Sequence, residues 1–171
     1  MLLKQVKLSN NMKIYIGTDH AGFELKEKLN VYLVELGYDV EDLGAHNYIE
    51  NDDYPDYIKE VSEAVAEDSG SFGIILGGSG QGEAMCANRT IGVRAMAFYG
   101  PKEPVASVDV DGMESADPFE IIKLAREHNN ANILSIGVRF VTEDEAKFAI
   151  ELFLSTKFSG DERHIRRINK F

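Results

Sequence analysis

The chain contains 171 residues, a length typical of one domain, and its 44% hydrophobic and 27% charged residues are ordinary for a globular protein. A net charge of −11 gives a surface that on average repels nucleic acid and anionic membranes, so neither is expected as a partner. No apolar run approaches the roughly 20 residues of a membrane span, and lysines interrupt the start too early for a secretion signal. The single cysteine, Cys86, cannot form an internal disulfide, which favours the reducing cytoplasm.

Short apolar runs alternate with helical spacings along the whole chain. Residues 12–16 form an apolar run before Gly17, and residues 25–36 then place their leucines on one helical face. Gly37 suits the end of that helix, and Pro55 suits the first turn of the next one. The periodicity predicts strands near 12–16, 40–43, 72–76, 93–98 and 133–136, and helices near 25–36, 55–65, 83–88, 119–127 and 143–156.

This alternation predicts a single doubly wound α/β domain. The crossovers between the expected strands are long enough to return the chain for parallel pairing in a sheet of about five strands. Ligands of such sheets bind beyond the carboxyl ends of the strands, which here carry Asp19-His20, the loop 77–82 and Arg139. Residues 100–118 are rich in turn residues and are expected to form a long loop.

The strongest local signal is the loop Gly77-Gly78-Ser79-Gly80-Gln81-Gly82. Its four glycines leave the backbone free to turn several N–H groups toward one anion. A phosphate cradle and an oxyanion hole would both use such a loop, and a tight turn without chemistry is the third reading. The spacing does not match the dinucleotide-binding fingerprint, and no Gly-Lys-Ser/Thr of a P-loop follows.

Ionisable side chains stand next to this loop and at two other places. Glu83 follows Ser79 by four residues, so both can face one point, although a carboxylate at a helix start is also an ordinary stabilising feature. The helix end would lower the pKa of Glu83, whereas apolar surroundings would raise it. Asp19 and His20 follow a strand end, where a helix-capping aspartate is the structural alternative.

Two further histidines and a group of arginines lie late in the chain. His128-Asn129 precede a strand, and Arg163, Arg166 and Arg167 gather beside His164 in a basic cluster that runs against the overall acidity. No two histidines show the spacing of a zinc site, and no Cys-x-x-Cys is present. We therefore expect neither a metal nor a cofactor.

Several separate motifs occur in one order over residues 12–168: Gly17-Thr18-Asp19-His20-Ala21-Gly22-Phe23-Glu24-Leu25-Lys26, Asp53-Tyr54-Pro55, the 77–83 loop, Ala87-Asn88-Arg89, Gly92-Val93-Arg94-Ala95, His128-Asn129-Asn130-Ala131-Asn132-Ile133-Leu134, Gly137-Val138-Arg139 and Arg163-His164 with Arg166-Arg167-Ile168. The chain resembles, through these motifs, the family of ribose-5-phosphate isomerase B and its galactose-6-phosphate isomerase relatives. The resemblance implies a Rossmann-like three-layer sandwich with a five-stranded parallel sheet. It also implies a homodimer, or a tetramer built from dimers, with active sites shared between subunits.

The same resemblance implies an aldose–ketose isomerase that acts on a sugar phosphate through a cis-enediolate, without metal or cofactor. Ribose 5-phosphate and ribulose 5-phosphate are the leading substrate pair. A hexose 6-phosphate of allose or galactose, or a non-catalytic sugar-phosphate-binding module, are the alternatives. The chain departs from the family pattern in an N-terminal extension over residues 1–11 and in the longer segment 100–118, which is close enough to reshape the pocket.

Roles for individual residues also follow from the resemblance. Glu83 would be the base, with Ser79 moving a proton between O1 and O2, and one branch of the family instead has a cysteine where this chain has Gly77. Asp19 and His20 would contact the sugar, and His128 would assist ring opening. The implied substrate-binding residues are Tyr54, Gly78, Gly80, Gln81 and Gly82, together with Asn129 and the phosphate-holding arginines Arg139, Arg163 and Arg167.

Overall fold

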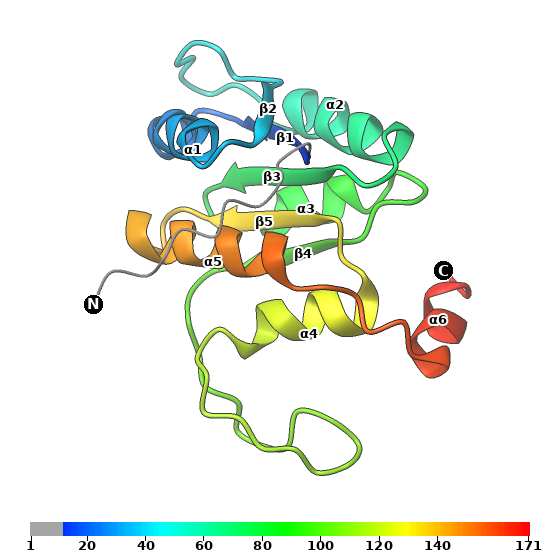
Figure 1. Ribbon diagram of the computed structural model, residues 1–171. Coiled ribbons are helices and arrows are strands. Elements are labelled where there is room, and N and C mark those ends of the chain that lie inside the picture. Colours follow the sequence, from blue (N-terminus) through cyan, green and yellow to red (C-terminus); the bar gives the residue numbers. More distant parts are fainter. Residues whose placement is uncertain (1–11) are drawn as a thin grey trace.

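A five-stranded parallel sheet forms the centre of the structure, a computed structural model that describes residues 12–171 (Figure 1). Across the sheet the strands lie in the order β2 (Asp39–Asp42), β1 (Lys13–Thr18), β3 (Phe72–Gly77), β5 (Ile133–Gly137) and β4 (Ala95–Phe98). Every strand pairing is parallel, so the predicted α/β class and five-stranded sheet are confirmed. The predicted extension 1–11 lies outside the described residues.

Helices cover both faces of this sheet and complete three layers. One face packs against α1 (Phe23–Glu35), α4 (Glu120–Asn129) and α5 (Glu143–Ser155), and the other packs against α2 (Tyr54–Glu67) and α3 (Gln81–Ala87). Strand side chains alternate between the two apolar layers, with Ile74 and Leu76 in one and Ile75 in the other. Because both faces are covered at the centre of the sheet, β3 and β5 are near-continuous apolar runs, whereas the edge strand β2 is acidic and partly exposed.

The predicted elements agree with the structure to within a few residues, with one omission. Gly37 follows α1 at a φ of +89°, and Pro55 lies in the first turn of α2, as expected from their residue types. The short helix α6 (Glu162–Ile168) was not predicted. Only His164 is buried in α6, so no apolar stripe marks it in the sequence.

The strand order creates a place where loops diverge at the carboxyl edge of the sheet. From β1 the chain moves outward to β2, whereas β3 lies on the opposite side of β1, so the winding reverses between β1 and β3. The β3 arrow in Figure 1 points toward this edge, and α6 and the C-terminus lie at the other edge. Residues 99–119 run between β4 and α4 as neither helix nor strand.

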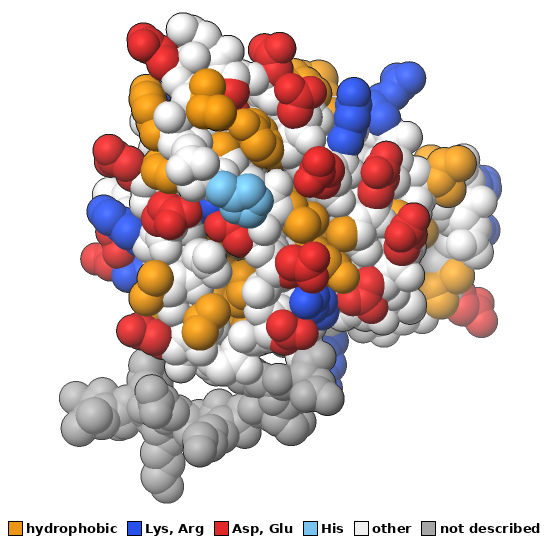
Figure 2. Space-filling model, turned by 90° about the horizontal axis from the view of Figure 1, so that it is seen from above, with side chains coloured by type: hydrophobic (Ala, Val, Ile, Leu, Met, Phe, Trp, Pro, Cys, Tyr) orange, Lys and Arg blue, Asp and Glu red, His pale blue; other side chains and the backbone are white. Residues whose placement is uncertain are grey.

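The described surface carries the acidity expected from composition. Figure 2, which views the β2 side of the molecule, shows many acidic side chains and few basic ones on that face. Among residues 12–171, no helix combines the length and apolar character needed to cross a membrane.

Candidate active site

Three loops meet at the carboxyl edge of the central strands. Gly77, the last residue of β3, pairs in register with Gly137, the last residue of β5, and Thr18 ends β1 beside Leu76. Asp19-His20, the loop 77–82 and Arg139 therefore leave neighbouring strands at the same place. The predicted gathering of these three segments is confirmed by the register.

The loop after β3 is shaped by close contacts that leave no room for side chains. Gly80 has a φ of +73°, and a Cβ there would lie 3.0 Å from the main-chain nitrogen of Gly137. A Cβ at Gly77 would lie 1.9 Å from Oε1 of Glu83, so the glutamate carboxylate occupies the space directly over Gly77. The Ser135 hydroxyl donates to the Gly80 carbonyl at 2.7 Å and fixes the loop to β5. These close contacts fix the loop backbone, and the carboxylate of Glu83 packs directly against it.

Glu83 is buried in the first turn of α3, with 5% of its surface exposed. Burial raises the pKa of its carboxyl group, the negative charge of Asp19 raises it further, and the nearby positive charge of Arg139 lowers it only in part. Of the two opposing effects weighed from the sequence, burial exceeds the stabilisation by neighbouring main-chain groups. A carboxylate with a raised pKa is a better proton acceptor near neutral pH.

Asp19 lies close enough to Glu83 for its charge to act on it, and it forms a second ionisable group with His20 and Asp52. Asp19 is buried and its Oδ1 accepts from the Ala21 main-chain N–H at 3.0 Å, while burial raises the pKa of its carboxyl group. The His20 Nδ1 lies 2.7 Å from Oδ1 of Asp52, and the His20 main-chain N–H donates to the same oxygen at 2.8 Å. The hydrogen bond to Asp52 raises the pKa of His20, which favours a protonated imidazole.

Asp19, His20 and Asp52 could also be considered as metal ligands, because their ligand atoms lie within 4.8 Å of one another. The short contact between His20 and Asp52 is a charge-assisted hydrogen bond that accounts for the cluster without an ion. The expectation of a metal-free site stays a prediction.

Arg139 and Tyr54 border the same loop. A Cβ at Gly78 would lie 3.0 Å from Cζ of Arg139, so the exposed guanidinium lies over the loop backbone. Tyr54 begins α2, and its hydroxyl would be 2.8 Å from a Cβ at Gly82. The predicted residues that lie together at this edge are Asp19, His20, Tyr54, Gly78, Ser79, Gly80, Gln81, Gly82, Glu83 and Arg139.

The other predicted residues lie at the opposite edge of the sheet. His128 and Asn129 end α4 just before β5 begins, whereas the Glu83 loop follows the end of β3. Five residues of β5 separate the two edges by roughly 17 Å at about 3.3 Å per residue. Within one chain, His128, Asn129, Arg163 and Arg167 therefore do not meet Glu83.

This second group is organised by His164, which is buried in α6. Its ring stacks on His128 with a centroid distance of 4.2 Å and an interplanar angle of 12°. The Nε of Arg163 donates to Nε2 of His164 at 3.2 Å. Burial lowers the pKa of His164, and the nearby charges of His128 and Arg163 lower it further, so the ring accepts from Arg163 as a neutral imidazole.

The family model described as Ribose/Galactose Isomerase matches residues 14–109 and 115–171 of this chain. The chain belongs to this family. The short break in the match, at 110–114, falls inside the segment predicted as an insertion. The Mycobacterium leprae (strain TN) protein named ribose-5-phosphate isomerase B is 36% identical over 160 residues, which cover 94% of this chain and 88% of the relative.

Solved structures of the family have the same fold. The ribose 5-phosphate isomerase from Thermotoga maritima is 40% identical with a TM-score of 0.79, covering 94% of this chain and 97% of that one. Ribose-5-phosphate isomerase B from Mycoplasma genitalium, solved with bound ribulose-5-phosphate, is 33% identical with a TM-score of 0.80, covering 94% of each chain. The recognition made from the motifs and the Rossmann-like sandwich it implied are both confirmed.

Two residues of this family member's candidate site were not singled out from the sequence. Asp52 lies in a polar loop, 32 residues from the His20 it contacts, and directly before the Asp53-Tyr54-Pro55 motif. His164 was noted only as part of a basic cluster.

Proposed function

We propose that the chain is an isomerase that converts ribose 5-phosphate into ribulose 5-phosphate, with Glu83 as the base. The observation that carries the proposal is the buried Glu83 carboxyl group, which lies over Gly77 next to the loop 78–82 and has a raised pKa. The relatives named ribose-5-phosphate isomerase B, one of them solved with ribulose-5-phosphate, support the same reaction.

The reaction moves one hydrogen from C2 of the open sugar to C1. Glu83 takes the proton from C2, the bonding pair forms a C1–C2 double bond, and the negative charge passes to O1. Main-chain N–H groups of the loop 78–82 would stabilise this cis-enediolate, and such a donor typically contributes about 2.7–4 kcal/mol to transition-state stabilisation. Ser79 would carry a proton from O2 to O1, after which Glu83 returns its proton to C1.

Ring opening and phosphate binding need groups that one chain holds at its far edge. We infer that the protein acts as a homodimer in which His128, Asn129, Arg163 and Arg167 of one copy meet Glu83 of the other. The separation of the two groups within a chain, by roughly the length of β5, supports this arrangement. His128 would take the proton from O1, the C1–O1 double bond would form as the bond between C1 and the ring oxygen breaks, and the ring oxygen would take a proton from water. The arginines would hold the phosphate with Arg139.

We propose that the protein acts in the cytoplasm. The single cysteine and the net charge of −11 support it, because one cysteine cannot form an internal disulfide and a negative surface repels anionic membranes.

A hexose 6-phosphate of allose or galactose is the second candidate substrate, because the long segment 99–119 starts at the site. A Cβ at Gly137 would lie 3.2 Å from Cβ of Tyr99, and Gly100 faces the carbonyl of Phe140, next to Arg139. Because segment 99–119 begins beside the site, its length can change the volume available to the carbon chain of the sugar.

Glu83→Gln tests the proposed reaction. The amide keeps the size of the carboxylate but cannot accept the C2 proton, so kcat should fall by roughly 10²–10⁴-fold while KM changes little. Conversion of ribose 5-phosphate, and of allose 6-phosphate in parallel, is the measurement, with Glu63→Gln on the exposed side of α2 as the control. Full turnover by Glu83→Gln would remove Glu83 from the role of base. Phosphate binding without any turnover by the unmodified protein would favour the binding module.

A further inference from the structure

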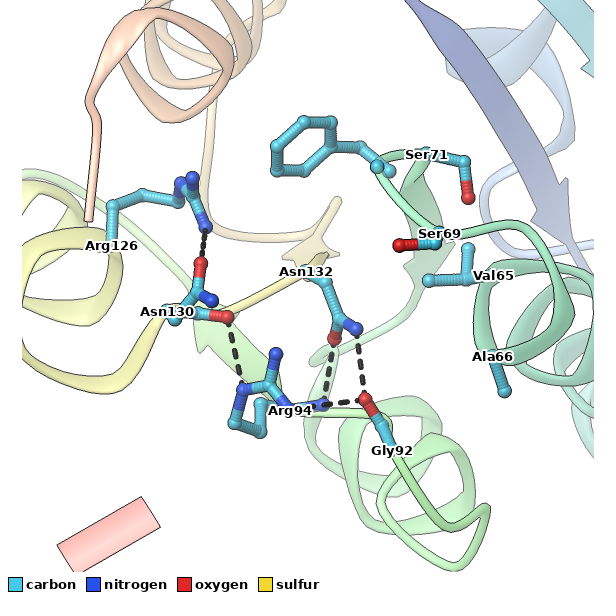
Figure 3. A pocket seen from close by; sticks show the side chains of 11 residues that line it. Val65, Ala66, Ser69, Ser71, Gly92, Arg94, Arg126, Asn130 and Asn132 are labelled. Atoms are coloured by element: carbon cyan, nitrogen blue, oxygen red, sulfur yellow. Dashed lines mark hydrogen bonds between the residues drawn. The ribbon is translucent and has the colours of Figure 1, made fainter. Parts of the chain in front are cut away.

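A second pocket lies at the amino ends of β3, β4 and β5, at the edge of the sheet opposite Glu83 (Figure 3). Its volume is about 270 Å³. Arg94, just before β4, and Arg126, in the last turn of α4, line it together with the amide side chains of Asn130 and Asn132. The reaction proposed above uses none of these residues.

Both guanidinium groups are held rigidly through a single residue, Asn130. Arg94 donates from Nε to the Asn130 carbonyl at 3.0 Å, and Arg126 donates from Nη1 to the Asn130 side-chain oxygen at 3.0 Å. Further bonds run from Arg94 Nη1 to the Gly92 carbonyl at 3.1 Å and from Arg126 Nε to the Thr156 carbonyl at 3.1 Å. Within residues 12–171, the Nη2 of each arginine donates no hydrogen bond, which leaves one end of each guanidinium available on the pocket wall.

These two positive charges have no negative partner. Across the described part of the chain, neither guanidinium lies within ion-pair distance of a carboxylate, although acidic residues outnumber basic ones 29 to 18. Burial lowers the pKa of Arg126, and the charge of Arg94 lowers it further, so the two cations repel each other. Burial likewise lowers the pKa of Arg94. Such an arrangement is costly until an anion is present.

We propose that the pocket between Arg94 and Arg126 binds a small doubly charged oxyanion, either inorganic phosphate or the phosphate group of a metabolite. Guanidinium groups are the preferred partners of phosphate because their parallel N–H donors match its oxygens. The site is prearranged by carbonyl and amide contacts, so little side-chain entropy is lost on binding. The hydroxyl of Ser69 at the rim and the remaining volume leave room for water or for part of a carbon skeleton.

A purely structural role explains only half of this arrangement. Arg126 packs over Phe72 and Phe153 and satisfies carbonyls at the end of α4, as a cation at a helix C-terminus does. Arg94 likewise satisfies the carbonyls of Asn130 and Gly92, but this role uses neither Nη2 group and leaves both positive charges without a carboxylate partner.

The pocket is directly connected to the second group of site residues. Asn130 is the C-terminal cap of α4, in the left-handed conformation with a φ of +46°, and His128 and Asn129 are the two residues before it. An anion held by Arg94 and Arg126 would therefore brace the helix end that carries His128.

Titration of the full-length protein with inorganic phosphate, followed by NMR of the main-chain amides, tests the proposal. We expect saturable shifts at Gly92 and Asn132, separate from any shifts in the loop 78–82, which the proposed substrate phosphate would cause. Arg94→Gln should weaken binding at Gly92 and Asn132 about tenfold or more, and leave the loop 78–82 responses unchanged. Arg89→Gln, an exposed arginine at the same edge, is the matched control and should bind as the unmodified protein does.

Arg94→Lys keeps the charge without the fork of donors, so it should bind more weakly than the unmodified protein and more tightly than Arg94→Gln. If Arg94→Gln does not fold, the unmodified protein and the lysine variant decide the matter. Tighter binding of glycerol phosphate than of phosphate assigns the pocket to an ester, and equal or weaker binding assigns it to the free anion. Absence of shifts at Gly92 and Asn132 with both probes, or unchanged affinity in Arg94→Gln, would overturn the proposal.

Discussion

A site divided between two copies can be tested by mixing two inactive variants. Glu83→Gln damages the group at the carboxyl edge, and His128→Ala damages the group at the amino edge, roughly 17 Å away along β5. In a mixed dimer both lesions fall in one site, and the other site combines an intact Glu83 with an intact His128. Random pairing makes about half of the dimers mixed, each with one working site of two, so about a quarter of the normal activity should return.

The two variants are unfolded together, refolded, and assayed for conversion of ribose 5-phosphate against each variant refolded alone. Mixing Glu83→Gln with Ser79→Ala is the control, because both lesions lie in the same group and every mixed dimer then has two damaged sites. If each chain contained a complete site, no mixture would regain activity, since every chain carries one lesion. Failure of the Glu83→Gln and His128→Ala mixture to exceed its separate components would refute the divided site.

Three further predictions concern the carboxyl-edge group. Gly77→Ala should lower kcat about a hundredfold, because the new Cβ would lie 1.9 Å from Oε1 of Glu83 and must displace the carboxylate. Gly70→Ala has open space but strains the backbone at a φ of +94°, so it should lower the melting temperature and keep kcat; equal kcat of the two variants would contradict this. Asp52→Asn should lower the pKa of His20, because its hydrogen bond to Asp52 raises that pKa; an NMR titration showing no change would refute the pairing. In the pH profile of kcat/KM, the apparent pKa of the acidic limb should lie above 4.5, the ordinary pKa of glutamate, because burial raises the pKa of Glu83. An apparent pKa at or below 4.5 would argue against Glu83 as the base.

The raised pKa of Glu83 also predicts how stability depends on pH. Folding favours the protonated carboxyl group, so its contribution is most favourable below the unfolded pKa and is lost as the pH rises through the folded pKa. Glu83→Gln should therefore gain thermal stability over the unmodified protein near neutral pH, and an equal melting temperature would contradict the shift.

The fold was accessible from the sequence because its signals are local and agree with one another. Residues 72–76 are a continuous apolar run because both faces of β3 are covered, and Gly37 and Pro55 mark helix ends through their own backbone preferences. The helix α6 gave no comparable signal, since a single inward histidine does not make an apolar stripe.

The candidate site was only partly accessible, because its properties depend on contacts between distant segments. The sign of the Glu83 pKa shift depends on how deeply α3 buries the side chain, which periodicity does not measure. The contact between His20 and Asp52 joins two loops whose relative position no pattern encodes. The separation of His128 from Glu83 was implicit in the parallel arrangement, since one residue precedes a strand and the other follows one.

The crowding of Gly77 against Glu83 constrains how this family can change its base. A side chain at position 77 and a glutamate at position 83 require the same volume, so a chain can carry one or the other but not both in their working positions. Moving proton transfer from one position to the other therefore requires changes at both residues, because a side chain at position 77 displaces the carboxylate of Glu83.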